Sequence, residues 1–107
     1  MVTNVTKSQQ LKAASKRYAA CLFGDFERAL ADDCKKTSFN PSWAVDCHPN
    51  LLPQKEQLRL KHYVKKEVKH LLKHFRYYNH TYQLDIITID IVDSELCISG
   101  RITLRTA

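Results

Sequence analysis

The sequence predicts an α+β protein whose helices pack on a curved antiparallel sheet of about three to four strands. Three observations predict this fold class. Apolar residues recur at helical spacing over residues 8–30 and again over 55–76, β-branched and aromatic residues dominate from residue 77, and the last segment alternates apolar and polar side chains. With 107 residues, the chain suits a single domain, 1–107, with one modest core.

The first helix is expected to begin near Ser8. Its apolar side chains follow one another at spacings of three and four: Leu11, Ala14, Tyr18 and Leu22. Gly24 is expected to end this helix, and the Asp25 carboxylate to accept hydrogen bonds from the first amides of a short second helix. Phe26 and Leu30 then lie on one face of that second helix.

The middle of the chain predicts a short strand followed by a long helix. Residues 35–50 are rich in turn formers, but Trp43, Val45 and Cys47 alternate there as in a strand. From Lys55 to Arg76 a single apolar stripe predicts the long helix, and its members are Leu60, Val64, Val68, Leu71 and Phe75.

The final third predicts a long hairpin. From residue 77 to 92, Leu84 and Ile86 share one side of a regular strand, whereas Ile87, Ile89 and Ile91 share the other. A side chain cannot change face in a regular strand, so we expect a bulge near Ile86 and Ile87. A turn at residues 93–95 leads into a last strand with one apolar and one polar side.

The long helix carries the whole net charge of the chain. Residues 55–76 contain eight basic and two acidic side chains, and the nine basic and nine acidic groups elsewhere cancel. We expect this surface to bind an acidic protein or a nucleic acid. The binding residues are predicted to be Lys61, Lys65, Lys66, Lys69 and Lys73. The alternative is a solvated face that keeps the chain in solution.

Several short motifs occur in a recognisable order. They are Arg17-Tyr18, Gly24-Asp25-Phe26, Ala31-Asp32-Asp33, the helix-to-hairpin step over Phe75 to Leu84, and Ile102-Thr103-Leu104. In this order the chain resembles the SnoaL-like and nuclear-transport-factor-2-like superfamily, which includes the ketosteroid isomerases. The resemblance implies a cone whose sheet and helices enclose a pocket for a small apolar ligand. Tyr18, Asn40 and Trp43 are its predicted lining.

The chain departs from the family pattern at the isomerase base. The matching position holds Asn40, before Pro41, and an amide cannot accept the proton. We therefore favour a non-catalytic or weakly catalytic binding module. A small-molecule isomerase or dehydratase is the alternative, with Tyr18, Asp46 and His48 as candidate catalytic residues, and sequence-nonspecific nucleic-acid binding is another.

A second departure concerns the sheet. The family continues with two more strands, so the strand from Leu96 to Leu104 is expected to keep an unpaired edge and to form a homodimer or larger assembly through it.

Neither a cofactor nor a metal is expected. His70 and His74 share a helix face, but lysines crowd that face and no carboxylate or thiolate completes the set. The first ten residues lack the apolar stretch of a secretion signal, and no apolar run approaches the length of a membrane span, so we expect a cytoplasmic protein with reduced thiols and no membrane contact.

Overall fold

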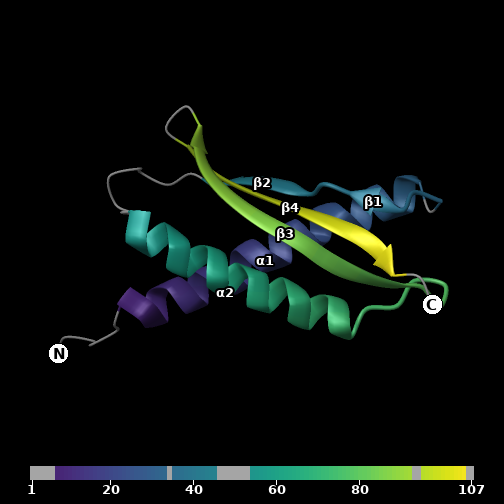
Figure 1. Ribbon diagram of the computed structural model, residues 1–107, viewed down its shortest axis with the longest axis horizontal. Coiled ribbons are helices and arrows are strands. Elements are labelled where there is room, and N and C mark those ends of the chain that lie inside the picture. Colours follow the sequence, from purple (N-terminus) through teal and green to yellow (C-terminus); the bar gives the residue numbers. More distant parts are fainter. Residues whose placement is uncertain (1–6, 34, 46–53, 93–94, 106–107) are drawn as a thin grey trace.

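The computed structural model describes residues 7–33, 35–45, 54–92 and 95–105. Two helices pack against an antiparallel sheet of four strands, which confirms the α+β class (Figure 1). The elements in chain order are α1 (Lys7–Asp32), β1 (Ser38–Phe39), β2 (Ser42–Val45), α2 (Gln54–Lys73), β3 (Thr81–Val92) and β4 (Glu95–Arg105). Within the described residues, neither helix is long and apolar enough to cross a membrane.

Helix α1 is one continuous helix, so the predicted break at Gly24 is wrong. The buried stripe continues on both sides of Gly24, because Leu22, Phe26 and Leu30 follow one another four residues apart and are each at most 1% exposed. Tertiary burial therefore overrides the weak helix propensity of glycine. Asp25 does not cap a second helix. Its carboxylate accepts a hydrogen bond from the backbone N–H of Ser42, at 3.1 Å, and so ties α1 to the start of β2.

The continuity of α1 can be tested at Gly24. A Cβ built at this position meets no atom within 4 Å, and the backbone there is not left-handed. Gly24→Ala should therefore stabilise the protein by about 0.5–1 kcal/mol, because alanine loses less backbone freedom on entering a helix. Thermal unfolding followed by circular dichroism should show a midpoint a few degrees higher. A lower midpoint would mean that the chain needs glycine to turn at residue 24.

The sheet is built around β4. Strand β3 pairs with one edge of β4 along its whole length, while β2 and β1 pair in succession with the other edge. The expected unpaired edge on Leu96 to Leu104 is therefore wrong, since these residues have partners on both sides. Two further hydrogen bonds, from Gly100 N–H to the Pro41 carbonyl and from Leu104 N–H to the Thr37 carbonyl, close the remaining gaps. A dimer stays a prediction, without this edge to support it.

The predicted bulge in β3 is confirmed. The register against β4 shifts between Leu84 and Ile86, so Leu84 and Ile87 both face the core while Ile86 is 52% exposed. The alternation of β4 is also confirmed, with Leu96, Ile98 and Ile102 buried. The short strand around Trp43 is present as β2, whereas Cys47 and the turn residues 93–94 lie outside the described residues.

An aromatic cluster joins the layers of the core. Phe26 of α1 is fully buried, and its ring centroid lies 5.1 Å from that of Phe39 and 5.2 Å from that of Tyr82. Phe23 and Phe75 complete the cluster at 5.8 and 5.6 Å from Phe26. One side chain thus links α1, β1, β3 and the segment that follows α2.

Candidate anion-binding cleft

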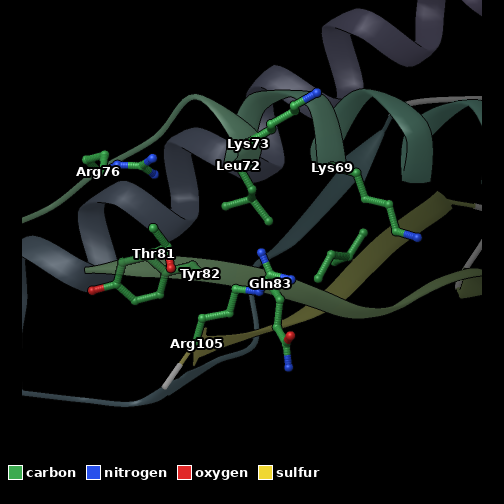
Figure 2. A pocket seen from close by; sticks show the side chains of 9 residues that line it. Lys69, Leu72, Lys73, Arg76, Thr81, Tyr82, Gln83 and Arg105 are labelled. Carbon is green, nitrogen blue, oxygen red and sulfur yellow. The ribbon is translucent and has the colours of Figure 1, made fainter. Parts of the chain in front are cut away.

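A half-open cleft of about 470 Å³ lies between the C-terminal end of α2 and the first residues of β3 (Figure 2). The lining residues come from α2, from the segment that follows it and from both strands of the hairpin. They are Lys69, Leu72, Lys73, Arg76, Thr81, Tyr82, Gln83, Leu84 and Arg105. All except Leu72 and Tyr82 are partly or fully exposed.

The charged residues described in the lining of the cleft are all positive. Among the described residues, its lining includes two lysines and two arginines but no carboxylate. Asp85 follows the lining residues on β3, and its carboxylate lies 3.8 Å from Nε of Arg101 on the outer face of the sheet. The other ion pair of the described residues joins Arg28 to Asp25. Among those residues, therefore, no salt bridge neutralises the cations of the cleft, and an anion entering it meets unpaired positive charge.

Burial of the apolar side of α2 fixes the direction of the cationic side chains on this helix. Leu60, Val64, Val68 and Leu72 are buried, and this stripe fixes the rotation of α2. Lys69 and Lys73, one turn apart, therefore lie beside the stripe at the margin of the sheet. Within α2 the last member of this stripe is Leu72, whereas the predicted stripe continued through Leu71, which is only half-buried, to Phe75.

Arg105 reaches the cleft through the register of the hairpin. Thr81 pairs with Arg105, so the end of β4 lies beside the start of β3, although the two residues are 24 positions apart. Sequence reasoning missed both Arg105 and Arg76 as members of the site. Counting the hairpin register back from the turn, with the bulge included, could have placed Arg105 beside Thr81. For Arg76, the only indication in the sequence was that it is a basic residue near the end of the predicted helix.

The cationic side chains spread instead of converging. In Figure 2 Leu72 points from α2 toward β3, whereas Lys69 and Lys73 extend away from each other. Arg105 approaches from the other wall of the cleft. A single small anion requires several donors aimed at one point. This arrangement suits instead an elongated partner that carries several negative charges.

The five lysines predicted to bind an acidic partner do not share one site. Lys69 and Lys73 line the cleft, while Lys66 lines a second hollow of about 340 Å³ between α1 and α2. That second hollow also contains Lys12, Lys16, Tyr63, Ser15 and the carboxylate of Glu67. Lys61 and Lys65 are half-buried and line neither hollow.

The structure does not bring the predicted ligand-pocket residues together at either hollow. Tyr18 is half-buried and packs against the hydrophobic core, whereas Asn40 and Trp43 are exposed. Asp46 and His48 lie outside the described residues. The small-ligand pocket and its acid-base pair therefore stay predictions.

His70, in the last turn of α2, and His74, just after the helix, do not form a complete metal site within the described residues. The rings of His70 and His74 have centroids 5.0 Å apart. In the described ranges, however, no three His, Cys, Asp or Glu side chains are grouped closely enough to hold a metal ion.

No family model, curated protein or solved structure matches this chain. The resemblance to the SnoaL-like superfamily accordingly stays a prediction. What the geometry defines is a class of surface: a cationic cleft at the margin of a small α+β domain.

Proposed function

We propose that this protein is a binding module that engages an acidic partner through the cationic cleft. The observation that carries the proposal is the lining of the cleft, in which the described residues include two lysines and two arginines but no carboxylate. Like charges that line one cleft repel one another, and a partner that brings negative charge relieves the repulsion. A merely solvated face would not require α2, the segment after it and β4 all to contribute cations to one hollow.

The lining favours an acidic polypeptide over a single-stranded nucleic acid. Single-stranded nucleic acids bind largely by stacking their bases on accessible aromatic rings. The aromatic residue of the cleft, Tyr82, is 4% exposed and packs in the core, so its ring is not accessible to a base. The exposed ring of Tyr78 lies outside the lining. The cleft thus offers charge and backbone to its partner, and little aromatic surface.

Binding of a fluorescent poly-L-glutamate, followed by anisotropy, tests this function. We expect binding at about 50 mM salt and a clearly weaker affinity at about 200 mM, because the interaction depends on charge. Duplex DNA and single-stranded RNA of equal charge are measured in parallel. Tighter binding of either nucleic acid would contradict a protein partner, and no binding of any probe at the lower salt concentration would contradict the function itself.

A further inference from the structure

Strand β3 has one edge that no described strand covers. Strand β3 pairs with β4 through its other edge, so β3 is the last strand on this side of the sheet. In an antiparallel pair, alternate residues direct their N–H and C=O groups to the neighbouring strand, and the rest direct theirs away from it. A strand of 12 residues therefore presents a row of backbone donors and acceptors along this margin. Such an edge is a template for another extended chain.

The cationic cleft runs along this same edge. Four consecutive residues of β3, from Thr81 to Leu84, line it. Successive side chains of a strand point to opposite faces, so a hollow that touches four in a row follows the margin of the strand and not one of its faces. Helix α2, which lies alongside β3 in Figure 1, supplies the opposite wall with Lys69 and Lys73. Backbone hydrogen-bonding groups and cations are thus available in one groove.

From this juxtaposition we propose that the acidic partner is an extended peptide segment that binds as an additional strand on the free edge of β3. The inference rests on the proposed function and names the partner and its mode of binding. The backbone of the peptide hydrogen-bonds to β3, and its acidic side chains, at alternate positions, face the lysines of α2. The cations are spread along the groove, as such a segment requires.

Charge argues against a second copy of this chain as the occupant. Pairing two β3 edges about a two-fold axis at residues 81–84, where the groove lies, would bring a second set of cleft cations toward Lys69, Lys73 and Arg76. Opposed like charges destabilise strand pairing, and lysines that flank an edge strand disfavour its pairing with the same strand of a second copy. An acidic segment is attracted instead of repelled, since each of its carboxylates approaches a cation.

The test uses a peptide of about eight residues, a common strand length, in which glutamate alternates with threonine. Two derivatives carry backbone N-methyl groups, one on every glutamate and the other on every threonine. Each derivative loses hydrogen-bonding capacity along one edge only, while its charge is unchanged. We expect one derivative to bind at least about tenfold more weakly than the parent peptide, since several hydrogen bonds are lost, and the other to bind within about threefold.

Amide NMR spectra of the ¹⁵N-labelled full chain show which residues of the protein contact the peptide. The largest shifts on adding the parent peptide are expected at residues 81–84. Equal binding of both derivatives, or equal loss in both, would overturn strand addition, and the proposed function would stand if poly-L-glutamate still binds. Failure of the parent peptide while poly-L-glutamate binds would likewise overturn strand addition alone. If neither binds, the proposed function fails and the inference fails with it.

Discussion

Replacing Phe26 with alanine should lower the free energy of unfolding by about 3–5 kcal/mol, the usual cost of removing a buried aromatic side chain. Its ring packs against four other aromatic rings, on α1, β1, β3 and the segment after α2. The cavity would open where these elements meet, so no single element could close it by a small shift. A domain of this size has a total stability of about 5–15 kcal/mol, and the loss is a large part of it.

Urea denaturation followed by circular dichroism measures this effect. With an m-value of about 1–3 kcal/mol/M, the midpoint should fall by about 2 M in Phe26→Ala. Leu58→Ala is the matched control, because Leu58 lies on α2 and its side chain is 62% exposed. That variant should stay within about 0.5 kcal/mol of the parent protein. A midpoint in Phe26→Ala equal to that of the control would mean that the aromatic cluster does not hold the layers together.

The elements that sequence reasoning placed correctly share a physical property. In β4, and in α2 as far as Val68, the same residues satisfy the local periodicity and face the core, so pattern and burial agree. The bulge in β3 was also predictable, because a strand with apolar residues on both sides must change face to bury them. These features depend on neighbours in sequence, which the sequence displays directly.

The features that were missed depend on partners distant in sequence. The helix continues through Gly24 because Phe26 packs against rings from three other elements, none of which local propensity can show. Strand β4 is central because β1 and β2 return to its second edge. The cleft follows from both, since Arg105 enters it only through the pairing of β4 with β3. The five predicted binding lysines were visible in the sequence, but not that Lys69 and Lys73 alone among them line the cleft.

Reversing the charge of Lys69 and Lys73 together should weaken the binding of poly-L-glutamate by at least about tenfold at low salt. Each substitution replaces an attraction of a few tenths to about 1 kcal/mol by a repulsion of similar size, so the two changes combine to exceed tenfold. Both side chains are exposed, and neither takes part in an ion pair of the described residues. The variant Lys69→Glu/Lys73→Glu should therefore keep the circular dichroism spectrum and unfolding midpoint of the parent protein.

The matched control separates the cleft from the net charge of the molecule. Arg17→Glu/Lys35→Glu makes the same change in formal charge, from +6 to +2, at two exposed positions that line neither hollow. Long-range attraction depends mainly on net charge and is screened beyond about 10 Å at 0.1 M salt, so the control should lose no more than about threefold. Equal losses in the two variants would show that poly-L-glutamate responds to the overall charge, and the cleft would then not be the binding site.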